Sequence, residues 1–200
     1  MTTQTATAHR FILETFAKTG RSPGLEQIRD RFGLDNTGAA EALVSELEQT
    51  GSIHRNAGDA QITHAYPFSN EPTAHRVHLE TAVEVYSMCA VDALGIPFML
   101  KQDGEIRSVC AHCGAGVRVA ISAGQVSASS PDGLVVWFPQ ARQGCVAATD
   151  LCPAVNFFCT AEHVEAWKQD QPDHSGELLS LEQAVERGRV IFERLMPDKD

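Results

Sequence analysis

The chain has 200 residues, of which 43% are hydrophobic and 21% are charged, and its formal net charge is −10. This length allows one large domain or two small ones with a real core, and the composition is that of a soluble globular protein. The negative charge argues against sequence-independent nucleic-acid binding and against adsorption to anionic membranes, since both need Lys and Arg.

The first eleven residues, MTTQTATAHRF, lack the apolar core of a signal peptide, and no stretch reaches transmembrane length. We therefore expect the protein in the cytoplasm, where thiols stay reduced. Clustered cysteines in that compartment indicate metal binding or catalysis rather than a disulfide framework. All six cysteines lie beyond residue 88, at positions 89, 110, 113, 145, 152 and 159.

Residues 1–70 are predicted to form a winged-helix-like domain of three helices followed by a β-hairpin. In the third helix, Ala40, Leu43, Val44 and Leu47 have the spacing of a buried stripe. The predicted helices cover residues 9–19, 24–32 and 37–49, and the predicted strands cover 52–55 and 60–68 around a turn at 56–59.

A winged helix would use its third helix to enter a DNA groove. Here that helix carries Glu41, Glu46 and Glu48 and no Lys or Arg. Phosphates would repel it, so DNA binding is disfavoured. We interpret the domain as a packing or dimerising module, which leaves a homodimer open.

Residues 74–200 are predicted to form a mixed core of antiparallel β-sheet with flanking helices, so the fold class is α+β. A helix should begin near Cys89 and end or kink at Pro97, which cannot supply a backbone donor. The other predicted elements are strands at 75–79, 104–113, 116–122, 125–129 and 133–139, a helix at 161–169 capped by Thr160, and a last helix with a capping box of Ser180 and Gln183.

Three groups of residues could carry chemistry but give weak signals. Cys110 and Cys113 have the spacing of half a zinc site, and His112 could contribute. A tetrahedral zinc is still disfavoured, because no second CxxC and no HxxxH is present. His75 and His78 would lie on opposite faces of a strand, which disfavours a joint metal site, and the cysteine at position 145 is interpreted as a bystander.

Cys89 and Asp92 form the most informative pair. They lie three residues apart in the apolar stretch 85–100, and on a helix this spacing would place both side chains on one face. A thiol could then bind a soft metal while the carboxylate moves a proton. The plain alternative is a buried core cysteine beside a surface aspartate. Cys152 is followed by Pro153, which restricts its backbone and suits a thiol fixed at a pocket mouth.

The sequence resembles the organomercurial (alkylmercury) lyase family. The resemblance lies in YSMCAVDALGIP around Cys89 and Asp92, in RSVCAHCGAGVRVAIS, in FPQ, and in LCPAVNFF around Cys152. These blocks follow one another in the family's order across roughly residues 74–160. Each block is weakly specific alone, whereas the ordered set is fairly specific.

The resemblance implies cleavage of carbon–mercury bonds by protonolysis, giving a hydrocarbon and Hg(II). Cys89 and Cys152 would be the nucleophiles and the final ligands of the mercury product. Asp92 would be the proton relay and would also contact the bound mercury. No organic cofactor would be required. Hg(II) would leave by exchange onto small thiols or onto a mercuric reductase. Cys110 corresponds to a family cysteine that is regarded as structural.

The sequence departs from the family pattern at a few positions. Met88 stands where an aromatic residue is common, which leaves the substrate preference open. Pro153 stands where a second cysteine can occur. Cys113 and Cys159 look like additions, and with Cys110 they are candidates for accessory mercury-binding thiols.

Two other functions remain open at the level of sequence. One is a metal-responsive regulator, in which the winged helix reports on a thiolate metal site. The other is a non-catalytic mercury- or copper-binding protein. The acidic third helix disfavours the regulator. Asp92 disfavours the binding protein, which needs ligands but no acid.

Overall fold

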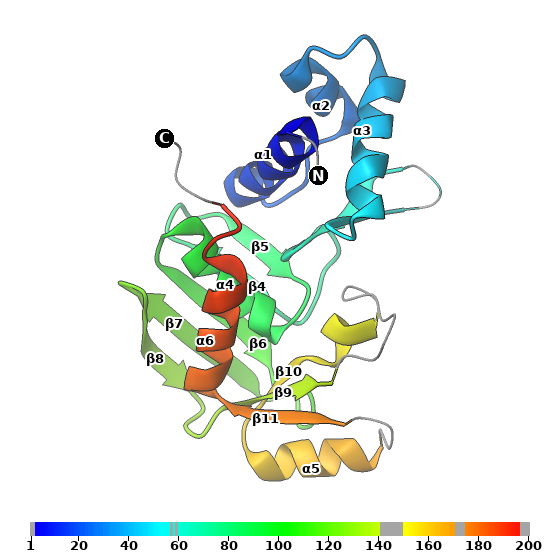
Figure 1. Cartoon of the computed structure of the whole chain (residues 1–200). Coiled ribbons are helices and arrows are strands. Elements are labelled where there is room, and N and C mark those ends of the chain that lie inside the picture. The colour runs from blue at the N-terminus through cyan, green and yellow to red at the C-terminus, as the bar shows by residue number, and fades with distance from the viewer. Residues whose placement is uncertain (1–2, 57, 59, 141–149, 171–174, 197–200) are drawn as a thin grey trace.

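The computed structural model shows an α+β fold, as predicted (Figure 1). None of the described helices is long and apolar enough to cross a membrane. The residues described are 3–56, 58, 60–140, 150–170 and 175–196; positions 57 and 59 of the predicted turn and the cysteine at position 145 lie outside them.

Three helices form one end of the molecule (Figure 1). Gly33 ends the second in the left-handed conformation, and Asn36 caps the third by accepting a hydrogen bond from the Ala39 amide at 3.0 Å. The first begins before the predicted residue 9, and the Thr5 hydroxyl on its added turn donates to Glu46 at 3.0 Å. The helices are α1 (Thr3–Thr19), α2 (Leu25–Phe32) and α3 (Thr37–Gln49).

An eight-stranded antiparallel sheet in the order β1-β2-β3-β5-β4-β6-β7-β8 is formed by residues between 53 and 130. The hairpin after α3 is part of this sheet, because Phe68 of β3 pairs with Ser87 of β5. Phe68 also stacks on Phe16 of α1 at 5.1 Å between ring centroids. The strands are β1 (Ile53–Arg55), β2 (Ile62–Ala65), β3 (Phe68–Ser69), β4 (Arg76–Leu79), β5 (Glu84–Ser87), β6 (Gly104–Val109), β7 (Gly116–Ser122) and β8 (Gln125–Ser130).

A second, three-stranded sheet in the order β10-β9-β11 lies at the end opposite α1 to α3, beside α5 (Figure 1). Its strands are β9 (Val135–Pro139), β10 (Asn156–Phe158) and β11 (Gly176–Ser180). Helix α5 (Ala161–Gln169) has the predicted bounds and the predicted Thr160 cap. Strands β5 and β11 were not predicted, since each has only four or five residues and a largely polar sequence without clear alternation.

Helix α4 (Ala90–Leu100) occupies the centre and is buried on nearly every side. Helix α6 (Leu181–Phe192), with the predicted capping box, lies along it over one face of the large sheet (Figure 1). The two backbones approach closely at Gly95 and Gly188: a methyl group at Gly95 would lie 2.9 Å from the Gly188 carbonyl oxygen. This contact holds the beginning of α4 in a fixed place.

Of the two predicted effects of Pro97, an end or a kink of the helix, the end does not occur. The helix continues past Pro97 to Leu100, and Lys101 then ends it in the left-handed conformation. Proline removes one backbone donor, which costs stability, but burial of residues 90–99 favours the helix more strongly.

Candidate functional site

Cys89, Asp92 and Cys152 meet inside the molecule, although the last is sixty positions from Asp92. The two sulfurs and a carboxylate oxygen all lie within 4.8 Å of one another, and the three residues are 1–3% exposed. The Cys152 thiol donates toward Asp92 Oδ2 at 3.7 Å. The interpretation of Asp92 as a surface aspartate is therefore excluded.

Cys89 stands at the N-cap of α4 rather than inside the helix. Its backbone is extended, and its sulfur accepts a hydrogen bond from the Asp92 amide at 3.4 Å. The sequence correctly brought the two side chains together, but the expected i, i+3 helical pair is in fact a capping contact. The helix N-terminus turns its free amides and the positive end of its dipole toward this sulfur.

Cys152 reaches the site on a short 3-10 turn, Cys152–Ala154. Its carbonyl accepts from the Val155 amide at 3.1 Å, and the Val155 carbonyl accepts from the Ala90 amide at 3.1 Å. Backbone hydrogen bonds thus tie the Cys152 segment to the first residue of α4. They hold the Cys152 thiol beside the Cys89 thiol, which caps the same helix.

The pKa of Asp92 is raised to about 7, because burial disfavours the charged carboxylate and outweighs hydrogen bonds from Cys89, Tyr66 and Cys152 that favour it. One carboxylate oxygen, Oδ1, is buried without a hydrogen-bond partner. A carboxyl group with this pKa can both accept and give up a proton near neutral pH.

The pKa of the Cys89 thiol is raised well above its usual value, first by burial and then by its contacts with Cys152 and Asp92. The helix N-terminus opposes this shift without reversing it. Burial also raises the pKa of Tyr66, with the nearby Asp92, Cys89 and Cys152 acting in the same direction. The resting site therefore holds a protonated thiol and a protonated phenol around one carboxyl group.

Tyr66 lies beside Asp92, Cys89 and Cys152, and no sequence motif pointed to it. It follows β2 and is joined to Pro67 by a cis peptide bond. Its ring packs against Phe192 of α6 at 4.9 Å between centroids. Tyr66 lies outside the sequence blocks that resemble the lyase family. Its place beside Asp92 becomes visible only in the folded sheet, to which β2 belongs.

A pocket of about 280 Å³ opens onto Cys152. Met88 lines it, as does His75, whose pKa burial lowers to about 4 so that its ring is neutral at physiological pH. The His75 ring hydrogen-bonds the Ser108 hydroxyl at 2.9 Å. The other lining residues are His64, Thr73, Ala74, Pro153 and Asn156.

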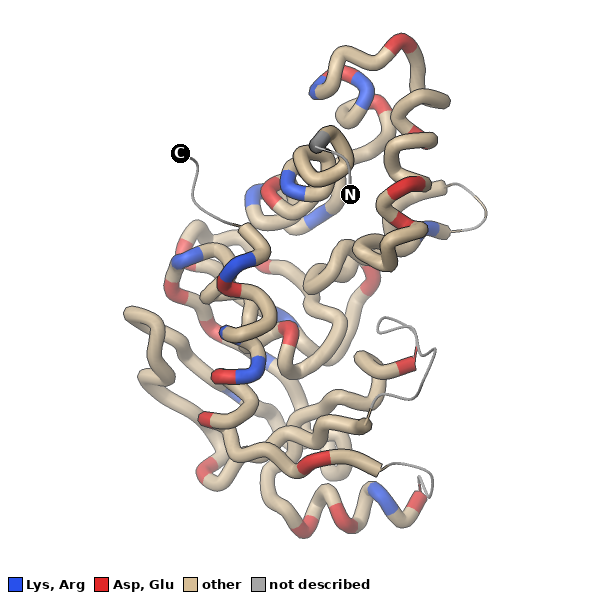
Figure 2. Tube along the Cα trace, viewed as in Figure 1, with Lys and Arg blue, Asp and Glu red and all other residues tan. Residues whose placement is uncertain are grey.

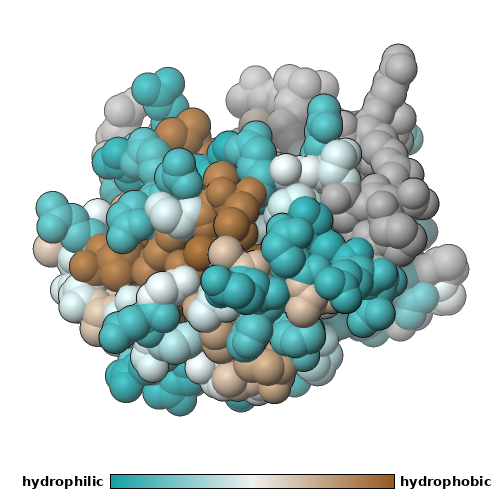
Figure 3. Space-filling model, turned by 90° about the horizontal axis from the view of Figure 1, so that it is seen from below, coloured by the Kyte–Doolittle hydropathy of each residue, from teal (hydrophilic) through white to brown (hydrophobic). Residues whose placement is uncertain are grey.

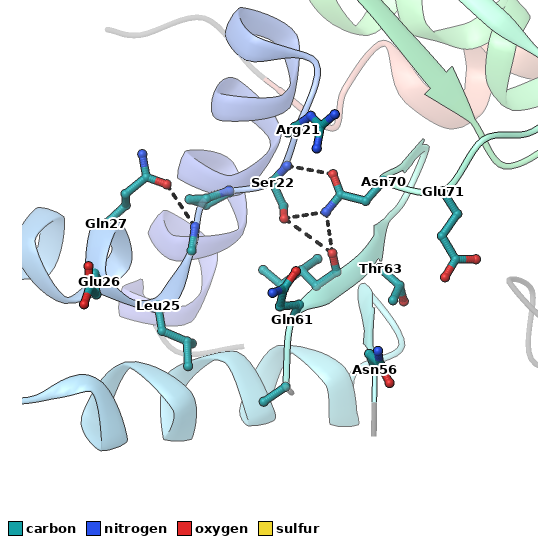
Figure 4. A pocket seen from close by; sticks show the side chains of 14 residues that line it. Arg21, Ser22, Leu25, Glu26, Gln27, Asn56, Gln61, Thr63, Asn70 and Glu71 are labelled. Carbon is teal, nitrogen blue, oxygen red and sulfur yellow. Dashed lines mark hydrogen bonds between the residues drawn. The ribbon is translucent and has the colours of Figure 1, made fainter. Parts of the chain in front are cut away.

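A larger pocket of about 780 Å³ lies away from these groups, between the α1–α2 connection and β2 (Figure 4). Asn70 spans part of its wall, accepting from the Ser22 amide at 3.0 Å and donating to the Ser22 hydroxyl at 2.6 Å. Its lining contains no cysteine, and neither Asp92 nor Tyr66. Of these two pockets, the smaller one reaches the buried group, through Cys152.

A second group of metal-ligating side chains gathers Cys110, Cys113, Cys159 and His163, with all four ligand atoms within 4.8 Å of one another. The sequence pointed to the three cysteines as accessory thiols and to Cys110 and Cys113 as half of a zinc site, but not to His163. The second half is Cys159-x-x-x-His163, a spacing that brings two ligands together when a helix begins between them. His78 lies elsewhere, 2.8 Å from Glu84, so it forms no joint site with His75.

The model of the alkylmercury lyase (MerB) family matches residues 68–193. An alkylmercury lyase of Streptomyces lividans is 27% identical over 191 residues, which cover 94% of this chain and 82% of that protein. One of Staphylococcus epidermidis is 27% identical over 129 residues, covering 64% of this chain and 58% of that protein. The crystal structure of the mercury-bound form of MerB2 superposes with a TM-score of 0.82 at 26% identity, covering 98% of this chain and 93% of that one. This chain belongs to the alkylmercury lyase family.

Proposed function

We propose that this chain cleaves the carbon–mercury bond of organomercurials by protonolysis. The observation that carries the proposal is the buried convergence of two thiols and one carboxyl group at the end of a pocket. Soft thiolate ligands select soft metal ions, and a buried carboxyl group beside them supplies the proton that a carbon leaving group needs.

The reaction begins with the attack of a thiol on the mercury of R–Hg⁺, which enters as an adduct with a small thiol. Cys152 lines the pocket and the Cys89 sulfur lies within 4.8 Å of its sulfur, so we assign the first contact with mercury to one of these two thiols. Each thiol must lose its proton as its sulfur binds mercury. The first proton passes to the Asp92 carboxylate, 3.7 Å from the Cys152 sulfur.

In the next step the carbon–mercury bond breaks. Two sulfurs on one mercury raise the electron density on the carbon ligand, the bonding electron pair stays with carbon, and the proton held by Asp92 moves to it. The sum is R–Hg–SR′ plus two protein thiols giving R–H, mercury bound by two protein thiolates, and the small thiol R′SH, which leaves with the second proton. No oxidant, reductant or organic cofactor enters this balance.

The product Hg(II), held by Cys89 and Cys152, leaves by ligand exchange. Small thiols or the cysteines of a mercuric reductase are the proposed acceptors, because thiolates exchange readily at an open metal site. This proposal places the protein where thiols are reduced, as in the cytoplasm, and the five described cysteines are free.

The test is the release of methane from methylmercury in the presence of excess small thiol, followed by gas chromatography of the headspace. Cys89→Ser and Cys152→Ser should each abolish turnover, and Asp92→Ala should bind the organomercurial but release methane much more slowly. Circular dichroism of each variant checks the fold. Undiminished turnover in either cysteine variant would refute the assignment.

Substrate preference is proposed to depend on Met88, which lines the pocket that opens onto Cys152. A flexible methionine can adapt its shape to different organic groups. Replacement by a rigid aromatic residue, Met88→Tyr, should favour small alkyl groups over aryl groups. The ratio of initial rates with methylmercury and phenylmercury measures this preference.

For the N-terminal part we propose a winged-helix-like packing module rather than a DNA-binding domain. Helix α3 carries three glutamates and no Lys or Arg (Figure 2), and Arg55 of the adjoining hairpin is paired with Glu48 at 2.8 Å. The sequence units 1–70 and 74–200 remain a proposed division, since β1 to β3 continue the sheet of the second unit. Homodimerisation likewise remains a prediction.

A further inference from the structure

We propose that Cys110, Cys113, Cys159 and His163 bind one Zn²⁺ ion, and that this ion has a structural role. The four side chains come from two segments about fifty residues apart and meet at a place separate from the thiols of the reaction. Three thiolates and one imidazole are a common ligand set of structural zinc sites. The proposal does not depend on the lyase activity.

The distances fit a tetrahedral ion. With zinc–sulfur and zinc–nitrogen bonds of about 2.3 and 2.05 Å, the edges of a tetrahedron are about 3.8 Å between two sulfurs and about 3.6 Å between sulfur and nitrogen. The Cys113 and Cys159 sulfurs are 3.8 Å apart, and the Cys110 sulfur is 3.5 Å from His163 Nδ1. These two pairs share no atom, so they would form opposite edges of the tetrahedron around the ion, and the remaining ligand distances are within 4.8 Å.

The first pair of ligands sits in a tight turn between β6 and β7. The Cys110 amide donates to the Ala115 carbonyl at 2.8 Å, and the Gly114 amide donates to the Cys110 carbonyl at 2.9 Å. Gly114 has a φ of +71°, a conformation that glycine adopts without strain. This backbone brings the Cys113 side chain round to face Cys110 before any ion binds.

The second pair is fixed by the beginning of α5. Cys159 follows β10, Thr160 caps the helix, and the Thr160 hydroxyl accepts from the His163 amide at 3.4 Å. The cap turns the first helical residues back toward Cys159, so that Nδ1 of His163 faces the same space as the sulfur. Both halves of the site are therefore set by local backbone structure.

The two clusters differ in the number of protein ligands, which is what distinguishes a closed structural metal site from an open reactive one. Four protein ligands close the coordination shell of zinc and leave no position for a substrate. Cys89 and Cys152 provide only two sulfurs, and the pocket opens onto one of them. Zinc suits the closed cluster because three thiolates with one imidazole match its preference for sulfur and nitrogen ligands.

A metal here would join the two sheets. The β6–β7 turn belongs to the large sheet, whereas Cys159 and His163 extend from β10 of the small one. One backbone hydrogen bond already links these parts, from the Ala111 amide to the Phe157 carbonyl at 3.0 Å. Strand β10 begins four residues after Cys152, so the ion would anchor the segment that carries this thiol.

The experiment is the zinc content of protein expressed with added zinc and purified under reducing conditions, measured by native mass spectrometry and elemental analysis. We expect one zinc per chain in the natural protein and in the double variant Cys89→Ser/Cys152→Ser, which removes the other sulfurs. The double variant Cys113→Ser/Cys159→Ser should lose it. His112→Ala, which removes a neighbouring imidazole, should keep it.

A second measurement keeps the inference testable if that variant fails to fold. Protein refolded with Co²⁺ should show the absorption bands of a tetrahedral thiolate complex, and His163→Ala should change them while His112→Ala does not. Protein that takes up neither zinc nor cobalt would overturn the proposal. A Cys113–Cys159 disulfide that persists in protein purified under reducing conditions would overturn it as well. So would a loss of zinc in the Cys89→Ser/Cys152→Ser variant and not in the Cys113→Ser/Cys159→Ser variant.

Discussion

At the scale of single residues, the proposed proton relay depends on the carboxyl group of Asp92. Its pKa of about 7 is set mainly by burial among apolar residues of α4, with the two thiols and Tyr66 lowering it only in part. The same burial that adapts the group to accept and return a proton makes its charged form unfavourable. Function and stability therefore oppose each other at this position.

Asp92→Asn should make the protein more stable and inactive. The pKa of an aspartate is about 3.9 in an unfolded chain, and for Asp92 it rises to about 7 in the folded one. Stability is therefore lost as the pH rises from the first value to the second. The variant cannot ionise, so its free energy of unfolding should exceed that of the natural protein by about 2–4 kcal/mol near pH 8 and by little near pH 4.

Urea denaturation of both proteins at the two pH values measures this difference. A variant that is equally destabilised at both pH values would show that the carboxylate is not held in an unfavourable environment.

Tyr66→Phe should shift the pH dependence of the reaction. Because the phenol favours the ionised form of Asp92, its removal should raise the pKa of that carboxyl group. The single-turnover rate rises with pH as Asp92 becomes able to accept a thiol proton, so this rise should move to higher pH in the variant. Tyr86→Phe, which changes the only other tyrosine of the sequence, is the matched control. An unchanged pH dependence of the single-turnover rate would show that Tyr66 does not influence the proposed proton relay.

At the scale of elements, the crossing of α4 and α6 positions the site. Gly95 and Gly188 face each other there, and side chains on either would push the helices apart. The beginning of α4 carries Cys89 as its cap, so a shift of the helix moves the sulfur. A change in packing at this crossing should therefore change the distance between the Cys89 and Cys152 sulfurs.

Gly95→Ala should destabilise the protein by about 1–3 kcal/mol, the usual range for overpacking a core. It should also slow methane release, because the helix and its cap are displaced. Gly116→Ala in β7 is the control, since nothing lies within 4 Å of a methyl group at that position. Thermal denaturation and single-turnover rates of both variants provide the comparison; equal behaviour would mean that α4 tolerates the displacement.

Helices α3 and α5, strand β7 and the caps of α5 and α6 could be predicted from the sequence, because their apolar spacing and their first residues are local signals. Strands β5 and β11 could not, since neighbouring strands rather than their own residues define them. Helix α4 extends past Pro97 because its residues are buried in the core. The sequence rule that proline ends a helix takes no account of this burial.

The functional site divides in the same way. Cys89, Asp92 and Cys152 could be named from the resemblance, and the structure then brings the three together. Tyr66 and His163 could not be found from the sequence. Tyr66 comes from the hairpin after α3, and His163 lies on α5 and becomes a candidate ligand only because the fold places it beside Cys110. Contacts between distant segments are the part of the site that sequence patterns leave out.

At the scale of the whole molecule, one sheet connects the N-terminal helices to the rest of the protein. The apolar core includes Phe16 of α1 and Phe192 of α6. On the outer surface seen in Figure 3, hydrophobic residues form a band between hydrophilic ones. Large exposed apolar side chains among the described residues are Val109, Leu178, Val190 and Ile191.

A continuous sheet and core predict a single cooperative unfolding transition. Both tryptophans, Trp137 and Trp167, lie on the side of the small sheet, whereas circular dichroism also reports on α1 to α3. Urea transitions followed by tryptophan fluorescence and by circular dichroism should therefore coincide. Two separate transitions would mean that residues 1–70 unfold as an independent domain.

The most direct test of the proposed chemistry is the position of mercury after one turnover. Crystals of the protein treated with one equivalent of methylmercury should show a strong anomalous peak between the Cys89 and Cys152 sulfurs, bound to both and next to Asp92. Mercury found only at Cys110, Cys113 and Cys159, with none between Cys89 and Cys152, would contradict the proposed reaction.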